Sequence, residues 1–578
     1  MPFAKHAMKR NAEKHPTTLS RLLSNPLAMN QVVRSDSPSP PDAARGALPV
    51  LHPSEETRRL FDRTGDRNET LDRLEALLPD YLKVQRWFGA KDQAIRRVVV
   101  EETLCVQEDP LSATLSIVRV DLAHRTEFYL LPLALAHGEE AERILEENPR
   151  AALAWFESSD DEMRGLLHDA TANPAFWDTL FRWWQSNHTN HSPTSRYTTT
   201  LDSQARSLSI KQVGIFWGEQ SNSLAFFDDY FCMKLYRRLE PGLNPETELL
   251  DHFTRAGFAY APRLYGTLSL RHTDQTFVLA TLQQALPVET DGWTYALAMT
   301  QRFLNRVAGT PAPETPEQPA RNTDTAPEWL EEVAPEMLTL AHVLGIRTAE
   351  LHRVLAEADT PTLRPEPGSL DDTHTLLLRV RREIEQTRRI LDHHAGTLTD
   401  VPDDDAWQHS LHRLDQLART DALCRKIRVH GDYHLGQVVY GDGEFYLLDF
   451  EGEPARTLAE RRARDCSLRD VAGMLRSLDY AALSAWQDYR AQQPDEDDPT
   501  LEAWAFILVD WCETLFMKAY FAHAASPDLS LPPEARRLFV WTYLLQKALY
   551  EVRYELSHRP AWTWLPLRGL KRLLEEGS

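Results

Sequence analysis

The stretch "VHGDYHLGQVVYGDGEFYLLDFEGEP", residues 429–454, combines two carboxylates and an amide with residues that suit a buried sheet. The dipeptide Asp442-Gly443 separates "VVY" from "FYLL", and it favours a type I′ hairpin turn, in which both central residues have positive φ. A turn centred there places residue 448 opposite residue 437, so Gln437 and Asp449 meet at the open end of the hairpin, about 5 Å apart at their Cβ atoms. Asp432 precedes Gln437 in the loop that leads into the first strand.

These three side chains have the chemistry of a cation site with a proton acceptor beside it. An amide oxygen and a carboxylate are ligands for a hard divalent cation, and a second carboxylate next to them can take a proton. Taken singly, Asp432 and Asp449 fit loop caps and Gln437 fits an exposed strand end. The three together at these spacings favour a catalytic site.

The same spacing occurs in kinase-fold phosphotransferases. Those enzymes have a catalytic-loop Asp, a metal-binding amide soon after it, and a metal-binding Asp at the end of the next hairpin. Here "HGDYHLGQ" takes the place of HRDxxxxN, "DFE" takes the place of DFG, and no APE-type segment follows. The pattern therefore predicts a small-molecule kinase that uses ATP and Mg²⁺, with Asp432 as the base and Gln437 and Asp449 as the metal ligands.

The β-rich segment before the hairpin offers a lysine for the phosphates. Lys234 lies in "DYFCMKLYRRL" among apolar neighbours, and Glu248 follows on a helix that is expected to begin after Pro245. A lysine on such a strand is usually a solvated residue. In a chain with the catalytic triplet, we interpret Lys234 and Glu248 as the pair that orients the α- and β-phosphates.

Two further nucleotide contacts are predicted from position. The turn "WGEQSNSLAFF" is poor in glycine, yet Ser221, Asn222 and Ser223 offer hydrogen-bond donors to phosphate. The segment "FVLATLQQALPVETDGW" fits a strand that leads into a hinge, where the backbone from Gln284 to Leu286 would meet adenine. The chain contains no GxxxxGK[ST] motif, which excludes a P-loop nucleotide site.

Composition excludes several other classes of protein. The formal net charge of the 578 residues is −22, which argues against nonspecific binding to nucleic acid or to an anionic membrane. The longest apolar runs are too short to span a bilayer, and no apolar segment follows the basic N-terminus as in a secretory signal. Five cysteines without a CxxC pair fit a reducing cytoplasm better than a disulfide framework or a zinc site.

The chain is too long for one hydrophobic core, and its pattern predicts an α+β, bilobal kinase-like fold. Strands are predicted at "IRRVVVEETLCV", "ATLSIVRVDL" and "TEFYLLPLAL", and residues 138–195 are predicted to be helical. The Pro/Thr-rich stretch 309–328 is interpreted as a connector or surface insertion. The predicted segments are a flexible tail (1–54), an N-terminal α+β cap subdomain (55–200), a β-rich N-lobe or intermediate subdomain (201–290), and a mostly helical C-lobe (291–578) that contains the hairpin.

Several motifs together resemble the maltokinase family of the aminoglycoside-phosphotransferase-like superfamily. They are, in chain order, "VQRWFGAK", "EQSNS", "RRLEPGLNPETE", "ETDGWTYAL", "HGDYHLGQVVY…LLDFEGEP", "SLRDVAGMLRSLDYAA" and "KALYEVRYELSHRPAWTWLPLRG". The resemblance runs from about residue 70 to the C-terminus. It implies a cytoplasmic enzyme that makes maltose 1-phosphate from ATP and maltose, feeding α-glucan synthesis from trehalose, with trehalose synthase as a candidate partner.

Other polar and aromatic residues are weaker candidates for sugar contacts. His434 lies in the catalytic loop, and Arg469 opens a helix with Asp470, where a cap and a loop salt bridge are an equally good interpretation. His430 is expected to brace the loop through backbone contacts. On the helix "KALYEVRYELSHRP" one face presents two rings with charged neighbours, which core packing explains about as well: Tyr550, Tyr554, Glu555 and Arg559.

Two other functions stay open at this point. Sister families share the cap and the sequence motifs HGDxHxxQ and DFEGEP, so a kinase for another acceptor such as glucosamine is the first alternative. The second is a non-catalytic partner subunit of trehalose synthase, which the intact Asp432, Gln437, Asp449 and Lys234 disfavour.

Overall fold

The computed structural model describes residues 48–52, 69–107, 113–157, 164–188, 196–216, 221–312, 325–394, 396–492, 499–524 and 531–575. The chain divides into two compact units, which we call unit 1 (up to Asp251, with Pro262–Pro287) and unit 2 (His252–Ala261 and Val288 onward). Within the described ranges, no helix is both long and apolar enough to cross a bilayer. The predicted tail lies outside these ranges except for residues 48–52, and the predicted insertion is described only at its ends.

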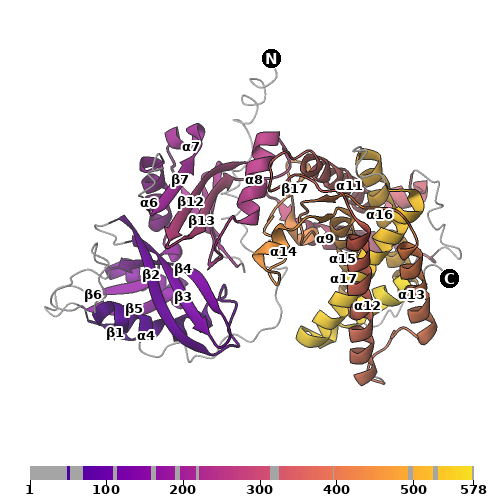
Figure 1. Cartoon of the computed structure of the whole chain (residues 1–578), viewed down its shortest axis with the longest axis horizontal. Coiled ribbons are helices and arrows are strands. Elements are labelled where there is room, and N and C mark those ends of the chain that lie inside the picture. Colours follow the sequence, from indigo (N-terminus) through magenta and orange to yellow (C-terminus); the bar gives the residue numbers. More distant parts are fainter. Residues whose placement is uncertain are drawn as a thin grey trace, which may run out of the picture. The chain divides into compact units, whose positions relative to one another are not determined.

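The first sheet of unit 1 has the strand order β1-β5-β6-β4-β3-β2, with β11 paired to β4. Figure 1 shows β2, β3 and β4 as the longest arrows of this sheet. Helix α4 packs Leu74, Leu78 and Leu82 into the core of the sheet. The bounds are β1 (Val50–Leu51), α4 (Glu69–Val84), β2 (Ile95–Gln107), β3 (Ala113–Leu122), β4 (Thr126–Ala136), α5 (Gly138–Glu147), η2 (Pro149–Ala151), β5 (Ala152–Glu157), β6 (Arg164–Asp169), η3 (Ala170–Ala172), α6 (Pro174–Ser186) and β11 (Arg238–Leu239).

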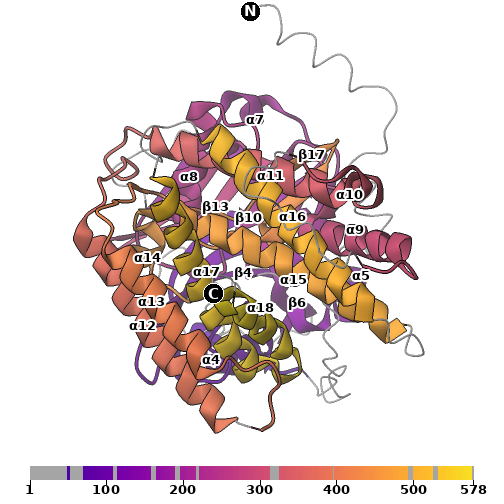
Figure 2. The same cartoon turned by 90° about the vertical axis from the view of Figure 1, so that its right-hand side faces the viewer.

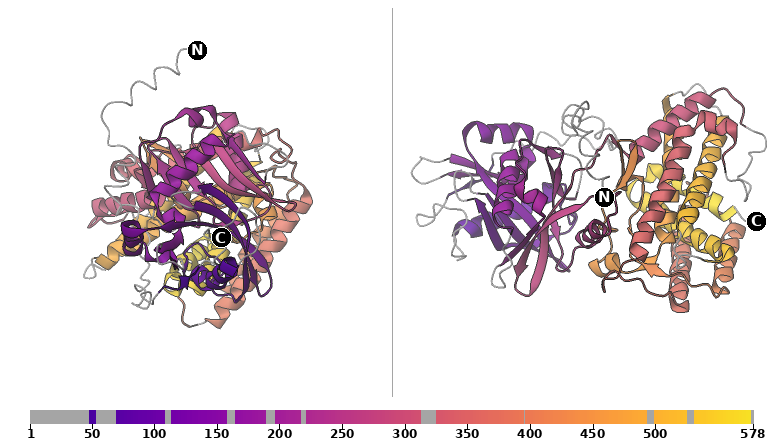
Figure 3. Two further views of the ribbon diagram at one scale, coloured as in Figure 1. Left: turned by 90° about the vertical axis from the view of Figure 1, so that its left-hand side faces the viewer. Right: turned by 90° about the horizontal axis from the view of Figure 1, so that it is seen from above.

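The second sheet of unit 1 has the order β7-β12-β13-β10-β9-β8 and carries Lys234 on its strand β10. Rings from α6, including Phe181 and Trp184, pack with Phe227 and Phe231 in one core. Figure 3 shows this magenta sheet and the indigo sheet of unit 1 from two sides. The bounds are β7 (Tyr197–Leu201), α7 (Ser203–Ser207), β8 (Val213–Phe216), β9 (Ser223–Phe227), β10 (Phe231–Leu235), α8 (Pro245–Ala256), β12 (Leu264–His272) and β13 (Gln275–Gln284).

Unit 2 is mostly helical, and its few short strands carry the hairpin. Helix α11 packs against α16, α16 against α15, and α15 against α17, and Figure 2 shows α12 and α13 along one side of this group. The helices are α9 (Gly292–Val307), α10 (Glu328–Val333), α11 (Pro335–Ala356), α12 (Leu370–His393), α13 (Asp404–Ala418), η4 (Leu435–Gln437), α14 (Leu458–Arg462), α15 (Leu468–Gln492), α16 (Pro499–His523), α17 (Pro533–His558), η6 (Pro560–Trp562) and α18 (Trp564–Glu575). The strands are β14 (Thr290–Asp291), β15 (Lys426–Ile427), β16 (Val438–Gly441), β17 (Glu444–Leu447) and β18 (Asp465–Cys466).

Two predictions about unit 1 differ in outcome. The strands predicted from alternating runs are present as β2, β3 and β4 within a residue or two of their predicted ends. The all-helical prediction for residues 138–195 is wrong, because strands β5 and β6 lie between α5 and α6. Short apolar runs such as "ALAWFE" fit a buried strand and a helix equally well until their sheet partners are known.

The sequence favoured a reducing environment over a disulfide framework, and the structure differs from that expectation at one pair of cysteines. Cys424 and Cys466 are joined by a disulfide, with their Cα atoms 5.7 Å apart. The bond connects the segment before β15 to β18, and these two strands are hydrogen-bonded neighbours. The two cysteines meet because β15 and β18 pair as antiparallel strands. This pairing is a tertiary contact, so the spacing of the cysteines in the sequence could not predict the bond.

Candidate active site

The hairpin has the predicted turn and the predicted register. Residues 438 and 447 are paired, as are 440 and 445, and Leu448 N–H donates to the carbonyl of Gln437 over 2.9 Å. Asp442 and Gly443 have φ of 52° and 80°, as a type I′ turn requires. The local sequence alone therefore determined which residues meet at the open end of the hairpin.

At that open end the side chains of Gln437 and Asp449 touch. Gln437 Nε2 donates to Asp449 Oδ2 over 3.2 Å, and a half-turn of the amide would direct its oxygen to the same place. Asp449 has φ of 60°, a left-handed conformation that Asp tolerates better than most residues. Two oxygen-bearing groups side by side suit a hard divalent cation such as Mg²⁺.

The loop that carries Asp432 is held from beneath by Asp470, the third residue of α15. Asp470 Oδ2 accepts from His430 N–H over 2.7 Å, and Asp470 Oδ1 accepts from Gly431 N–H over 2.9 Å. Gly431 has φ of 84°, where an L side chain would be strained. The two hydrogen bonds fix the backbone immediately before Asp432.

Asp470 is buried, and its surroundings favour the ionised form of its carboxyl group. Burial alone would raise the pKa of its carboxyl group, but the hydrogen bond and charge of His352, the charge of His430 and the Gly431 N–H hold that pKa below its usual value. His352 Nε2 lies 3.2 Å from Asp470 Oδ2. A buried carboxylate with several donors is a rigid anchor, because each donor would lose its partner if the loop moved.

Three further contacts hold the same loop. His430 Nε2 lies 2.9 Å from the carbonyl oxygen of Leu448, which ties the catalytic loop to the segment of Asp449 and confirms the predicted bracing role. Leu435 N–H donates to Ser477 Oγ over 3.0 Å. Arg469 Nη2 donates to the carbonyl of Gly431 over 3.1 Å, so it acts on the loop backbone.

A cavity of about 100 Å³ opens beside Asp432, and we call it the acceptor cavity. Its walls come from the catalytic loop, from the segment after β17, and from α12, α15 and α17. The residues that line it are Glu383, Gly431, Asp432, Tyr433, Glu453, Arg456, Arg469, Asp470, Gly473, Tyr543, Gln546, Lys547 and Tyr550. Carboxylates, cations and rings around one carboxylate suit a polyhydroxyl acceptor.

Of the predicted sugar contacts on α17, only Tyr550 lines this cavity. Tyr554 stacks on Tyr550 and on His558, with ring centroids 6.1 and 4.5 Å apart. Glu555 is buried and bonds Arg559 over 2.6 Å, and burial raises the pKa of Glu555 more than Arg559 lowers it. One helical turn separates successive rings on this face, so the later residues lie beyond the cavity.

His434 does not line the acceptor cavity either. Its Nδ1 accepts from Gly436 N–H over 3.0 Å and caps the short helix η4, which ends at Gln437. Its Nε2 lies 4.0 Å from Asp432 Oδ2. Burial lowers the pKa of His434, against the opposing effect of Asp432. The ring of His434 therefore shapes the turn between Asp432 and Gln437.

In unit 1, Lys234 pairs with a glutamate two residues before the predicted one. Lys234 Nζ lies 2.8 Å from Glu246 Oε2, and both side chains are buried. Tyr236 Oη donates to the same Glu246 oxygen over 2.6 Å. Residues two apart on a helix lie on opposite faces, so we replace Glu248 by Glu246 as the partner of the lysine.

Two of the predicted phosphate contacts are used for a structural purpose. Arg237, which is buried, donates from its backbone N–H to Asn222 Oδ1 over 3.2 Å and from Nε to Ser223 Oγ over 2.8 Å. Arg237 Nη2 also lies 2.9 Å from Asp169 Oδ2 at the end of β6. Asn222 and Ser223 thus tie the second sheet to the first. Ser221 begins the described segment after β8, and its phosphate contact stays a prediction.

In the predicted hinge, the backbone N–H groups of Gln284 and Ala285 already donate hydrogen bonds within the protein. Gln284 N–H donates to the carbonyl of Arg263 over 2.8 Å, and Ala285 N–H donates to that of Tyr230 over 3.0 Å. Leu286 N–H has no hydrogen bond to any residue in the described ranges. Of the predicted adenine contacts, Leu286 therefore keeps an available backbone donor.

Several residues of the site had no signal in the sequence. For the pair Arg469-Asp470 the sequence left a cap with a loop salt bridge as an equally good interpretation, and the two backbone hydrogen bonds of Asp470 were not predicted. Ser477 and Glu383 reach the loop or the acceptor cavity from helices far from it in the sequence, and Arg456 reaches the cavity from the segment between β17 and α14. Only the packing of α12 and α15 in unit 2 brings these side chains to Asp432.

Comparison with known proteins supports the cap and the fold. Residues 81–172 match the family described as the maltokinase N-terminal cap domain. A glucosamine kinase of Streptacidiphilus jiangxiensis is 28% identical over 364 residues, which is 62% of this chain and 72% of that protein. A glucosamine kinase of Mycolicibacterium smegmatis is 26% identical over 365 residues, 62% of this chain and 79% of that protein.

Among solved structures, glucosamine kinase in complex with glucosamine, ADP and inorganic phosphate aligns with a TM-score of 0.56 at 20% identity. The alignment covers 86% of this chain and 98% of that chain. The predicted α+β kinase-like fold with an N-terminal cap is thereby confirmed. The likenesses as a whole are to phosphotransferases of the sugar and amino-sugar kinase type.

Proposed function

We propose that this chain, which carries a maltokinase N-terminal cap domain on a kinase-like fold, transfers the γ-phosphoryl group of ATP to the anomeric hydroxyl of maltose. The product would be maltose 1-phosphate. The observation that carries the proposal is the contact of Gln437 with Asp449 at the end of a hairpin whose preceding loop, with Asp432, is fixed beside a polar cavity.

In this reaction the anomeric oxygen attacks the γ-phosphorus, and the bond from that phosphorus to the β,γ-bridging oxygen breaks, so ADP leaves. Asp432 orients the anomeric hydroxyl and takes its proton. Asp470 and Arg469 hold the loop, so that Asp432 needs no rearrangement to act. Lys234, fixed by Glu246, is proposed to neutralise charge on the phosphates of ATP.

Gln437 and Asp449 are proposed to hold Mg²⁺. The fit is one of chemistry: both groups carry oxygen atoms, which this hard cation prefers, and they already touch. When bound, Mg²⁺ would supply positive charge that offsets the negative charge developing on the phosphates during transfer. The supply of maltose by trehalose synthase and the use of the product for α-glucan stay predictions of the resemblance.

Glucosamine is the second candidate acceptor, because the curated relatives that align over most of their length are glucosamine kinases. The acceptor cavity contains Glu383 and Glu453, and carboxylates of this kind suit an ammonium group. The same cavity also contains Arg456, Arg469 and Lys547, which oppose a cationic acceptor. With Asp432 and Asp470, four carboxylates line the cavity against these three cations. The charges nearly cancel, so the lining suits a neutral sugar and does not single out an ammonium group.

The test is the product formed from ATP and Mg²⁺ with maltose, glucosamine, glucose or choline as acceptor. Phosphate on the anomeric carbon of maltose, located by ³¹P and ¹H NMR, is the expected result. Transfer to glucosamine alone would establish the second candidate. Transfer to no acceptor, with Asp432→Asn indistinguishable from the unsubstituted chain, would favour the non-catalytic partner of trehalose synthase.

A further inference from the structure

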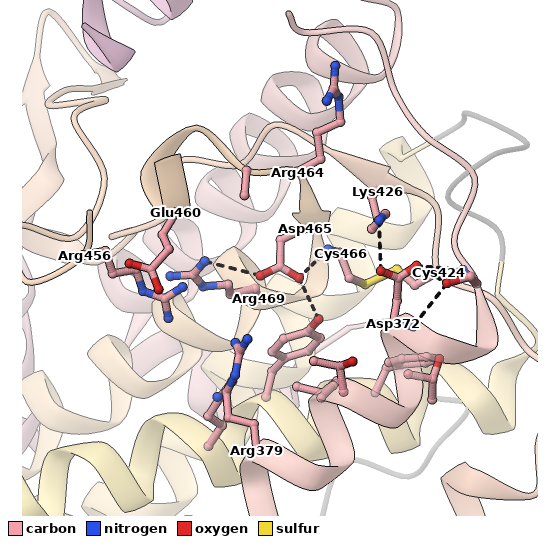
Figure 4. Close-up of a pocket in the computed structure, with 18 of the residues that line it drawn as sticks. Asp372, Arg379, Cys424, Lys426, Arg456, Glu460, Arg464, Asp465, Cys466 and Arg469 are labelled. Carbon is pink, nitrogen blue, oxygen red and sulfur yellow. Dashed lines mark hydrogen bonds and ion pairs between the residues drawn. A yellow bond between two sulfur atoms is a disulfide. The ribbon is translucent and has the colours of Figure 1, made fainter. Parts of the chain in front are cut away.

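A second and larger cavity lies next to the acceptor cavity within unit 2, and we call it the outer cavity (Figure 4). Its volume is about 450 Å³, within the range of ligand sites in proteins. Five residues line both cavities: Glu383, Arg456, Arg469, Tyr543 and Gln546. Asp432 lines only the smaller one. The two spaces are therefore neighbours, and the outer cavity continues away from the base.

The charges around the outer cavity nearly balance. Four carboxylates and five cationic side chains line it, and most of them are paired. Lys426 Nζ lies 2.9 Å from Asp372, and Arg469 Nη1 lies 3.3 Å from Asp465. Because these charges are paired, the wall attracts neither an anion nor a cation strongly. It offers many hydrogen-bonding groups, together with the rings of Phe539 and Tyr543.

Two guanidinium groups on this wall keep unused donors. Arg379 has no hydrogen bond or ion pair with any residue in the described ranges, and Figure 4 shows its side chain rising from α12 among the lining residues. Arg456 donates from Nε to Glu453 over 2.7 Å, and its two terminal nitrogens bond no residue in the part of the chain that the structure describes. Arginine donors without a protein acceptor suit an uncharged ligand that is rich in hydroxyl groups.

We infer that the acceptor site extends into the outer cavity, which binds the sugar rings beyond the ring that is phosphorylated. The inference rests on the proposed function and deepens it. The acceptors are linear glucose oligosaccharides, and a trisaccharide is bound at least as well as a disaccharide. Arg379 determines this preference from the outer cavity, and a single amino sugar would leave the cavity unfilled.

The experiment compares three variants on the surface of α12. Arg379→Ala removes the unused donors, and Thr375→Trp fills part of the outer cavity, which Thr375 also lines. Arg382→Ala is the matched control, because Arg382 is exposed on the same helix and lines neither cavity. Binding of glucose, glucosamine, maltose and maltotriose is measured by calorimetry without ATP, and KM and kcat are measured with ATP and Mg²⁺.

We expect Arg379→Ala to weaken maltotriose and maltose binding about tenfold, the effect of losing a hydrogen bond from a charged donor. Thr375→Trp should weaken maltotriose most. Neither variant should change binding of a monosaccharide, and Arg382→Ala should change nothing. Equal losses for all four sugars, or no loss for maltotriose, would overturn the inference.

The binding measurement separates this inference from the proposed function. If the chain binds maltotriose through Arg379 but phosphorylates no sugar, the outer cavity is confirmed and the kinase reaction is wrong. If the chain phosphorylates only a monosaccharide and binds no oligosaccharide, the kinase reaction stands and the outer cavity has no role in acceptor binding.

Discussion

Replacing Asp470 by Asn tests whether one buried carboxylate fixes the catalytic loop. Both oxygens of Asp470 accept from backbone N–H groups, Oδ2 from His430 and Oδ1 from Gly431. An asparagine has one oxygen and one NH₂ group at this position. Whichever way the amide is turned, its NH₂ group faces one of the two N–H donors, so one donor is left without an acceptor.

The expected loss of stability in Asp470→Asn follows from this one unpaired donor. A lost hydrogen bond to a charged group is worth about 1.5–3 kcal/mol, and a buried N–H without a partner adds about 1–3 kcal/mol. We expect the free energy of unfolding to fall by about 3–5 kcal/mol, the range found when one partner of a buried ionic group is removed. Because Asp432 follows directly, we also expect kcat to fall by about 100-fold, as for a displacement of about 1 Å.

Urea denaturation followed by circular dichroism measures the stability, and steady-state phosphoryl transfer measures kcat. Asp488→Asn is the matched control, since Asp488 is an exposed carboxylate on the same helix, α15. The reasoning is wrong if Asp470→Asn leaves both quantities within error of the Asp488→Asn values. A large loss of stability with unchanged kcat would refute only the positioning of Asp432.

The same carboxylate gives a pH dependence with a definite sign. The pKa of Asp470 in the folded chain is lower than its ordinary value. Its stabilisation is therefore complete above the unfolded pKa of about 3.9 and is lost as the pH falls through the folded pKa. Between pH 7 and pH 3, the unfolding free energy of Asp470→Asn should fall less than that of the unsubstituted chain.

Three further predictions concern neighbouring features. Asp449→Ala should abolish turnover and lower the unfolding free energy by only about 1–2 kcal/mol, the cost of alanine at the left-handed φ of this position, and near-normal activity would show that Asp449 binds no metal. Reduction of the disulfide between Cys424 and Cys466, which are 42 residues apart, should lower the unfolding free energy by about 4 kcal/mol. The measurement compares urea denaturation in the presence of a reductant with denaturation in its absence, and identical unfolding curves would contradict the prediction. In Gly473→Ala, the new Cβ would lie 2.6 Å from the carbonyl oxygen of Tyr433, so α15 must shift. We expect kcat/KM for the acceptor to fall, and an unchanged kcat/KM would show that the loop adapts.

Features of the chain that depend on local geometry could be predicted from the order of the residues alone. The turn at Asp442-Gly443 and the period of a strand place Gln437 beside Asp449, because the register of a two-residue hairpin follows from the turn alone. Strands β2, β3 and β4 were also predicted from the sequence, since their apolar and polar residues alternate. The strand of Lys234 and the start of α8 at Pro245 followed in the same way.

Features that depend on which helix faces lie together became known only from the packed chain. Glu246 rather than Glu248 meets Lys234, because two residues on a helix point to opposite sides and only the packing of α8 selects one. Asp470 reaches a loop about forty residues before it, Cys424 pairs with Cys466 across two short strands, and Arg379 faces a cavity whose other walls come from distant segments. No local pattern encodes such contacts, because they form only when several helices pack around one core.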